Sequence, residues 1–298
     1  MYDNKIICII ASLSLYKMKL IADGGSTKTS WSIFNDRVLQ KNFETEGYNP
    51  FYVTEEYIKQ SLITRFGADF NFQEVSSVFF YGAGCEGDKD YILKSALATV
   101  FPNATSEVHS DLIGAAKALI GDGSGMVSIL GTGMNTGMMN NGKLSQRIDG
   151  LGFYLGDEGS GGYLGRKLLK KYAREGLSKE ISEKFQTTYR LLPSQILKNF
   201  YDHPLQNKYA ASFTVFLYDN LHDDQIRIIV EDGFNDFFKN VITQYKNYDR
   251  YELNCVGSIA FVFQNILKNV ARSHQVSVSK ILKSPMDGLT SYHFPNHQ

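Results

Sequence analysis

Two short turns rich in glycine and threonine carry the residues best suited to bind phosphate. The first covers residues 23–29, Asp-Gly-Gly-Ser-Thr-Lys-Thr. Gly24 and Gly25 allow the backbone to approach an anion closely, so successive N–H groups can surround a phosphate. Asp23 can hold Mg2+ through water. The turn is not a Walker A loop, because G-x-x-x-x-G-K-[ST] occurs nowhere in the sequence. An ordinary hairpin turn is the alternative.

A second turn of this kind covers residues 131–137, Gly-Thr-Gly-Met-Asn-Thr-Gly, and follows a strand predicted at 126–130. A plain hairpin would explain either turn alone. Two such turns at equivalent points of two similar domains would instead clamp the phosphates of one nucleotide. The pair therefore favours nucleotide binding.

The run Gly82–Gly87 gives an alternative prediction, because Gly-Ala-Gly-Cys-Glu-Gly matches G-x-G-x-x-G between a strand and a helix. Asp111, further along, could then bind a ribose as in a dinucleotide-binding protein. That interpretation leaves the two turns unexplained, and a Rossmann unit would open its domain instead of following a three-stranded meander. Cys85 in this run is an isolated cysteine, which is typical of an inert thiol.

Two acidic positions have both a structural and a functional interpretation. Asp111 begins a predicted helix, where aspartate is most often an N-cap, but it could also accept a hydroxyl proton during phosphoryl transfer. Residues 150–162 place Asp157 and Glu158 among many glycines. Such a loop can hydrogen-bond a polyol, whereas Asp157 or Ser160 could simply cap the next helix.

The elements that would position these residues form two similar blocks. Each begins with strand, turn, strand, turn, strand and continues as alternating helix and strand. The first block has predicted strands at 18–23, 29–34, 38–43, 75–81 and 106–110 and helices at 55–66, 88–101 and 112–120. The second has strands at 126–130, 136–139, 143–148 and 253–256, with Asn141-Gly142 as a hairpin turn, and helices at 158–175, 194–201, 209–221, 226–248 and, after Gly257-Ser258, 259–273.

Length and composition agree with a two-domain intracellular protein. The chain has 298 residues, more than the roughly 250 at which one core stops growing. Its 31 basic and 31 acidic residues leave no surplus charge for nucleic acid. Cysteines at 8, 85 and 255 form no CxxC, so a reducing compartment is expected. Residues 6–15 are apolar but too short to span a membrane; a signal peptide is one interpretation, and a natural start at Met18 with a cytoplasmic location is the favoured one.

Together these residues resemble the sugar kinase, Hsp70 and actin superfamily, and within it the N-acetylglucosamine kinases and the BadF/BadG/BcrA/BcrD ATPase group. The resemblance runs from Met18 to about the C-terminus, and Gly-Asp-Glu-Gly-Ser is its most specific motif. It implies an α/β fold of two ribonuclease-H-like, actin-like ATPase domains around a central cleft. The domains would be 18–113, with the C-terminal helix 286–298 packed back on it, and 114–285, with a helical insertion at 177–249; residues 1–17 would be an extension.

The resemblance also implies a role for each site residue. Asp111 would be the catalytic base and Asp23 the residue that orients Mg2+. The nucleotide would contact Gly24, Gly25, Ser26, Thr27, Lys28, Thr132, Gly133, Gly257 and Ser258. The sugar would contact Asn49, Gly82, Asp111, Thr132, Gly133, Asn135, Gly150 and Asp157. Met134 departs from the pattern, because the kinases usually carry serine there.

The predicted function is therefore phosphorylation of the C6 hydroxyl of N-acetylglucosamine, or a related amino sugar, by ATP with Mg2+. No nucleic-acid or membrane partner is expected, and the family resemblance suggests a homodimer. One alternative is an ATPase that activates an acyl-CoA dehydratase or reductase through an iron–sulfur cluster, for which Cys85 and Cys255 show no paired spacing. The other is a non-catalytic sensor of sugar or nucleotide.

Overall fold

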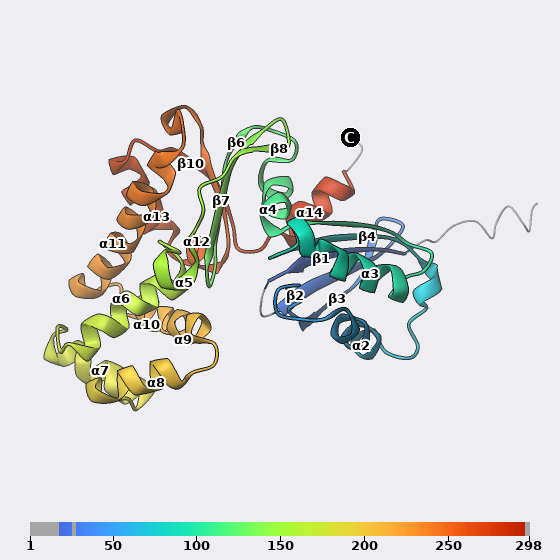
Figure 1. The fold of residues 1–298 in the computed structure, drawn as a ribbon. Helices are drawn as coiled ribbons and strands as arrows, with labels where there is room; N and C mark the ends of the chain where they lie inside the picture. The colour runs from blue at the N-terminus through green and yellow to red at the C-terminus, as the bar shows by residue number, and fades with distance from the viewer. Residues whose placement is uncertain (1–17, 26–27, 296–298) are drawn as a thin grey trace, which may run out of the picture. The chain divides into compact units, whose positions relative to one another are not determined.

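The computed structural model describes residues 18–25 and 28–295. The predicted extension 1–17, the predicted phosphate contacts Ser26 and Thr27, and the last three residues of the predicted C-terminal helix lie outside the described residues. The chain divides into two compact units, one ending at Gly114 and joined by the residues from Met286 onward, the other spanning Ala115–Pro285. Each unit contains one β-sheet (Figure 1).

The sheet of the first unit has five strands in the order β3-β2-β1-β4-β5. The first three strands form an antiparallel meander, and β4 and β5 extend it in parallel with β1. The strands are β1 (Met18–Gly24), β2 (Lys28–Asn35), β3 (Val38–Glu46), β4 (Val75–Gly82) and β5 (Thr105–Ser110).

Side chains alternate along β4 and cover both faces of this sheet. Val78 and Phe80 join the core that contains Trp31 and the apolar sides of α2 and α3. Phe79 and Tyr81 point the other way and contact His293 of α14. The helices of this unit are α2 (Glu55–Phe66), α3 (Asp90–Val100), the start of α4 (Asp111–Ile120) and α14 (Met286–His293), with the 3-10 turns η1 (Phe72–Glu74) and η2 (Gly87–Lys89).

Local signals set the ends of α2 where the sequence predicts them. The hydroxyl of Thr54 accepts a hydrogen bond from the N–H of Tyr57 at 3.2 Å, which satisfies one of the helix's first donors. Gly67, with a φ of 87°, ends the helix in a conformation that favours glycine.

The second unit repeats the topology of the first. Its five strands run in the order β10-β9-β6-β7-β8, so β6 is central as β1 is, with an antiparallel meander on one side and parallel strands on the other. This repetition confirms the predicted pair of similar α/β blocks. The strands are β6 (Gly125–Leu130), β7 (Met134–Asn140), β8 (Lys143–Gln146), β9 (Leu253–Val256) and β10 (Val278–Leu282).

Helices dominate the rest of the second unit (Figure 1). One apolar core joins β6, β7 and β9 to α6, α11 and α13. The helices are α5 (Gly152–Leu155), α6 (Gly161–Ala173), α7 (Lys179–Tyr189), α8 (Ile196–Asp202), α9 (Gln206–Ser212), α10 (Thr214–Asp219), α11 (Asp224–Asn240), α12 (Ser258–Val262) and α13 (Gln264–Ser273), with the 3-10 turns η3 (Pro193–Gln195), η4 (Ile242–Gln244) and η5 (Tyr248–Arg250).

The helix predicted at 158–175 begins later than expected. Asp157 and Gly159 have φ values of 59° and 75°, which an α-helix does not admit. Ser160 is the N-cap, since its hydroxyl accepts from the N–H of Tyr163 at 3.2 Å. The loop before α6 therefore keeps an irregular backbone up to residue 160.

Other predicted boundaries were wrong where helices break without glycine or proline. The predicted helix 209–221 is two helices meeting at Phe213, and the predicted helix 226–248 stops at Asn240 because Val241 has a φ of −121°. The predicted helix after Gly257 is likewise interrupted at Phe263. Helix α7 and strand β10 were not predicted, because α7 buries only two residues and β10 has no alternating burial.

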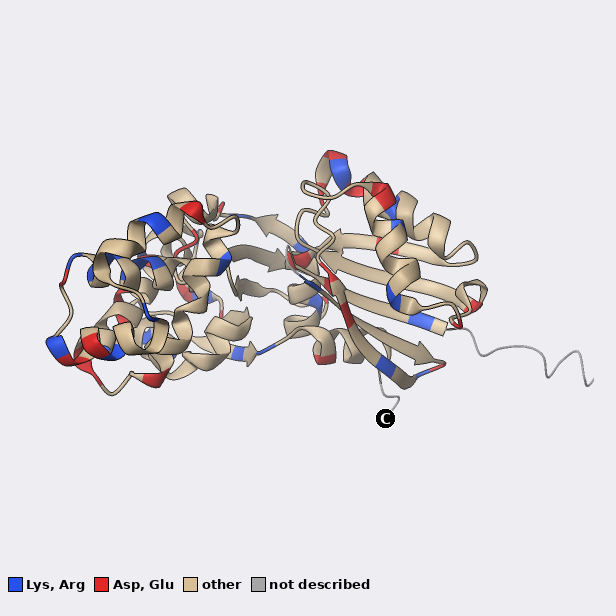
Figure 2. Cartoon of the chain, turned by 90° about the horizontal axis from the view of Figure 1, so that it is seen from below, with Lys and Arg blue, Asp and Glu red and all other residues tan. Residues whose placement is uncertain are grey.

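Charged residues of both signs occur on both units (Figure 2). This mixture agrees with the formal net charge of zero. Among the described residues, no helix combines the length and the apolar character that crossing a bilayer requires.

Candidate active site

The carboxyl ends of the parallel strands bring four predicted site residues to one edge of the first sheet. In the strand register Gly24 lies beside Gly82, and Gly82 lies beside Ser110. Asp23 immediately precedes Gly24, and Asp111 immediately follows Ser110. Ligands of α/β proteins commonly bind at such an edge, so this part of the first unit is a candidate site.

Two carboxylates act on each other at this edge. The pKa of Asp23 is raised from 3.8 to about 7. Burial is the main cause and the negative charge of Asp111 is the second, whereas the positive charge of Lys28 opposes the shift. Asp111 heads α4, and its Oδ1 accepts a hydrogen bond from the N–H of Leu112 at 2.8 Å. That bond fixes the carboxylate at the end of β5.

The same edge suits a hard divalent cation. Carboxylate pairs that repel each other are favourable ligands for Mg2+, which keeps several waters and is usually bound by one or two carboxylates together with phosphates. The hydroxyl of Thr29, paired with Gly24 in the hairpin, is fully buried and has no hydrogen-bond partner among the described residues. Asp23, Asp111 and Thr29 therefore fit a Mg2+ that is held largely through water and phosphate. Within residues 18–25 and 28–295 no three His, Cys, Asp or Glu side chains gather as metal ligands.

The first predicted phosphate turn is closed by a backbone hydrogen bond from the N–H of Gly25 to the carbonyl of Lys28, at 2.8 Å. The ammonium group of Lys28 forms an ion pair with Glu44 on β3, and both side chains are exposed. The side chain of Lys28 thus pairs with the neighbouring strand β3, and its backbone carbonyl closes the turn.

Asn49 lies against the loop that follows Gly82. Its Oδ1 accepts from the N–H of Phe51 at 3.0 Å. A Cβ placed on Gly84, whose φ is 75°, would come within 2.5 Å of the same oxygen, so only glycine allows this approach. Cys85 is buried in the same loop, and burial, reinforced by the charge of Asp111, raises the pKa of its thiol to about 12.

In the second unit, the start of α6 holds the second predicted turn in place. The N–H of Gly161 donates to the carbonyl of Gly131 at 2.8 Å, and the N–H of Gly162 donates to the carbonyl of Thr132 at 2.9 Å. These two donors belong to the first helical turn, which has no partners within its own helix. The contacts therefore satisfy α6 and fix the turn together.

Gly257 packs directly on the strand that leads into this turn. Its φ is 124°, and a Cβ there would lie 2.3 Å from the carbonyl oxygen of Leu130. Its N–H donates to the carbonyl of Leu282 at 2.9 Å, and Ser258 then begins α12. The predicted nucleotide residues Gly257 and Ser258 are thus beside Gly131 within the second unit.

Asp157 lies against two other predicted sugar residues, Gly133 and Gly150. Its buried carboxylate accepts from the N–H of Met134 at 3.2 Å, and a Cβ on Gly133 would lie 3.1 Å from Oδ2. Its own N–H donates to the carbonyl of Gly150 at 2.8 Å. Burial raises the pKa of Asp157, whereas the Met134 N–H and the charge of Arg166 lower it. Since Met134 contributes only its backbone N–H to this bond, the missing serine hydroxyl does not affect it.

Asn135 is held by an arginine that the sequence did not single out. Its Oδ1 accepts from the N–H of Thr136 at 3.0 Å and from the guanidinium of Arg147 at 3.1 Å. Arg147 and Arg166 are the polar residues of these sites that the sequence did not single out. Nothing in their spacing distinguishes them from an ordinary solvated arginine.

Comparison with solved structures identifies the family. The protein from Porphyromonas gingivalis described as a "Putative N-acetylglucosamine Kinase" superposes with a TM-score of 0.87 and 33% sequence identity, over 94% of this chain and 99% of that one. The chain belongs to the N-acetylglucosamine kinase family. No protein-family model and no curated protein matches it.

More distant structures share the fold of this N-acetylglucosamine kinase family member. A protein of the same description from Chromobacterium violaceum has a TM-score of 0.68 at 15% identity, over 93% of this chain and 98% of that one. A ROK family glucokinase from Streptomyces griseus, solved with glucose and AMPPNP, has a TM-score of 0.55 at 15% identity, over 92% of this chain and 97% of that one. The predicted fold class, two ribonuclease-H-like domains of the actin-like ATPase superfamily, is confirmed.

The predicted site residues of this family member fall into two groups. The first unit brings together Asp23, Gly24, Gly82 and Asp111, with Asn49 beside the adjoining loop. The second unit brings together the following residues: Thr132, Gly133, Asn135, Gly150, Asp157, Gly257 and Ser258. Each group is held by hydrogen bonds within its own unit, so each unit by itself positions its share of the predicted site residues.

Proposed function

We propose that the protein is an ATP-dependent kinase that phosphorylates the C6 hydroxyl of N-acetylglucosamine or of a closely related amino sugar. The observation that supports this most directly is the interacting carboxylate pair Asp23 and Asp111 at the carboxyl edge of the first sheet, in a chain that is similar to a family member over 94% of its residues.

Asp111 is the proposed base. Phosphoryl transfer to a hydroxyl needs positioning, charge stabilisation and a proton acceptor, and no covalent enzyme intermediate. The Asp111 carboxylate, held at the end of β5, would accept the proton of the C6 hydroxyl. Asp23 would hold Mg2+ through water, and the bound ion would neutralise charge on the transferred phosphate.

The remaining predicted residues would hold the two ligands. A carboxylate and an amide offer acceptors and donors for sugar hydroxyls, which suits Asp157 and Asn135 to the amino sugar. Proposed further sugar contacts are Asn49, Gly82, Thr132, Gly133 and Gly150. Proposed nucleotide contacts are Gly24, Gly25, Ser26, Thr27, Lys28, Thr132, Gly133, Gly257 and Ser258. We also propose a homodimer, which light scattering of the purified chain would test.

The deciding experiment is a screen of amino sugars and hexoses for ADP release with Mg-ATP, with mass and NMR analysis of the product. We expect phosphorylation at C6 of an amino sugar. Asp111→Asn keeps an oxygen for the Leu112 N–H, so it should fold normally yet lose about 10²- to 10⁴-fold in kcat while still binding ATP. The matched control is Asp202→Asn, at an exposed aspartate that pairs with Lys198 along its own helix.

Each negative result has a definite meaning. Absence of turnover with every sugar, alongside intact ATP binding, would refute the kinase proposal. Activity of Asp111→Asn equal to that of the unaltered protein would refute the base assignment. Phosphate found on another hydroxyl would refute only the C6 assignment.

A further inference from the structure

Arg166 on α6 holds the loop that carries Asp157. Its guanidinium donates to the carbonyl of Tyr154 at 3.2 Å and to the carbonyl of Gly156 at 3.0 Å. The guanidinium carbon also lies 4.6 Å from the centre of the Phe153 ring, within cation–π distance. One half-buried side chain thus contacts three of the four residues, 153–156, that precede Asp157.

The loop depends on such contacts because its own conformation is unfavourable. Leu151, Gly152 and Asp157 all have positive φ values, of 57°, 67° and 59°. For the two residues with a side chain, that conformation is disfavoured. The side chains of Leu151 and Leu155 are 60% and 81% exposed, so apolar burial contributes little to holding the loop. Phe153 stacks on Phe200, and hydrogen bonds supply further restraint.

Arg166 also acts on the charge of Asp157. Burial favours the neutral acid and raises the pKa of Asp157. The Met134 N–H and the positive charge of Arg166 oppose that shift, whereas the negative charges of Glu158 and Asp149 add to it. Arginine stays protonated throughout the working pH range, so its influence is constant. Loss of the guanidinium would therefore both loosen the loop and make Asp157 easier to protonate.

We propose that Arg166 is a positioning residue for sugar binding: it fixes residues 153–157 so that Asp157 presents an ionised carboxylate to the sugar hydroxyls. This inference rests on the proposed function, because the sugar role of Asp157 belongs to it. The planar guanidinium reaches two carbonyls while lying on an aromatic ring, which the single ammonium group of lysine cannot do.

The test compares Arg166→Met and Arg166→Lys with Lys170→Met, a matched loss of charge at an exposed position one turn further along the same helix. Calorimetry with N-acetylglucosamine and a non-hydrolysable ATP analogue should show sugar affinity about 10- to 100-fold weaker in Arg166→Met, with nucleotide affinity unchanged. Arg166→Lys should recover only part of the loss. Sugar affinity of Arg166→Met should also begin to fall at a higher pH than that of the unaltered protein as the solution is acidified.

Hydrogen exchange provides a readout that needs no sugar. The amide of Asp157, bonded to Gly150, and the amide of Met134, bonded to Asp157, should exchange faster in Arg166→Met than in Lys170→Met at equal global stability. If the unaltered protein binds no amino sugar, the proposed function fails, and exchange alone decides whether Arg166 holds the loop. Unchanged exchange at both amides would overturn the inference. If Arg166→Met does not fold, Arg166→Lys is judged by the same amides.

Discussion

The phenol oxygen of Tyr81 lies 2.8 Å from Nε2 of His293, although 212 residues separate them in the sequence. Tyr81 is fully buried on β4, and its ring fills the space left by Gly114, where a Cβ would come within 2.6 Å of the Tyr81 Cβ. His293, at the end of α14, also stacks on Phe79 at 3.9 Å between ring centres. The buried Tyr81 therefore hydrogen-bonds the C-terminal helix and packs against the helix that begins at Asp111, so both helices contact β4.

The Tyr81–His293 hydrogen bond should be measurable as a coupling energy. Tyr81→Phe keeps the ring and removes the hydroxyl, so we expect the free energy of unfolding to fall by about 1 kcal/mol. Urea unfolding of Tyr81→Phe, His293→Phe and the double variant would give the pairwise term. We expect a coupling of about 0.5–1 kcal/mol. Strictly additive effects would contradict the contact.

The contact between α6 and α9 at Gly165 should not tolerate a methyl group. A Cβ on Gly165 of α6 would lie 1.8 Å from the carbonyl oxygen of Ala210 on α9, and neither backbone can move without separating the helices. Gly165→Ala should therefore destabilise the protein by about 3 kcal/mol or more in urea unfolding. At Gly176 the nearest atoms are 3.3 Å away on Lys171, so Gly176→Ala is the control and should change stability by less than about 1 kcal/mol. Equal effects would refute the close packing.

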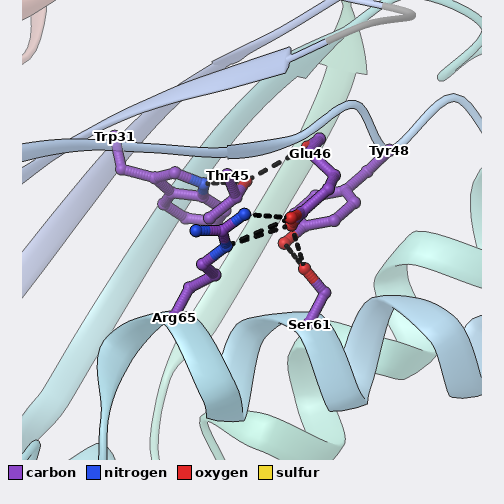
Figure 3. Close-up of polar contacts among 6 residues, drawn as sticks. All are labelled: Trp31, Thr45, Glu46, Tyr48, Ser61 and Arg65. Carbon is purple, nitrogen blue, oxygen red and sulfur yellow. Dashed lines mark hydrogen bonds and ion pairs between the residues drawn. The ribbon is translucent and has the colours of Figure 1, made fainter.

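A polar network joins Glu46 on β3 to α2 (Figure 3). The carboxylate of Glu46 accepts from the Nε of Arg65 at 3.1 Å and from the hydroxyl of Ser61 at 2.6 Å, and that hydroxyl lies 2.7 Å from the phenol oxygen of Tyr48. The bond from Arg65, followed by that from Ser61, lowers the pKa of Glu46 from 4.5 to about 2. The native state therefore favours the ionised form.

This shift predicts how stability depends on pH. Because the native pKa of Glu46 lies below its unfolded value, the contribution is complete above about pH 4.5 and disappears as the pH falls toward 2. The carboxylate is partly exposed, so solvent screening limits the effect to about 1 kcal/mol or less. Arg65→Met should be less stable than the unaltered protein in urea at pH 6, with the difference shrinking at pH 3. A difference that persists unchanged at pH 3 would contradict the assignment.

Sequence reasoning succeeded where local chemistry decides the structure. The helix predicted at 55–66 has the same bounds in the structure, where Thr54 and Gly67 flank it, and the predicted strands that precede Asp111 and carry Asp23 are present. It failed where a distant residue decides. Arg166 contacts carbonyls 10 and 12 residues earlier in the chain. Neither its residue type nor its spacing predicts these contacts.

The loop before α6 was predicted only in part. Its glycines indicate a loop at 150–162 with Ser160 as a possible cap, and Ser160 is the cap in the structure. The positive φ of Asp157, and its contacts with Gly150 and Met134, could not be predicted from residue types. Tertiary hydrogen bonds override local propensity at this loop, which is also where the proposed sugar contacts lie.

The approach of Gly84 to Asn49 gives a prediction about substrate affinity. Gly84→Ala would place its Cβ 2.5 Å from the Oδ1 of Asn49, so the amide must move. If Asn49 binds the sugar as proposed, the KM for the sugar should rise about tenfold or more while the KM for ATP stays the same. Gly87→Ala is a close control, because Gly87 has a similar φ of 71° but no atom within 4 Å of its Cβ position. Equal kinetic effects in both variants would mean that backbone strain, and not displacement of Asn49, is responsible.

The two described cysteines should be unreactive in the native protein. Cys85 and Cys255 are both buried, and burial raises the pKa of each thiol to about 12. The thiolate is the reactive form, so at pH 8 only about one thiol in 10⁴ would be available to a disulfide reagent even with free access. In a Cys8→Ser variant, which removes the one cysteine outside the described residues, we expect no rapid labelling in buffer and two labelled thiols in denaturing urea. Rapid native labelling of one thiol would contradict this, and Cys85→Ser in the same background would show whether the reactive group is the thiol beside Asp111.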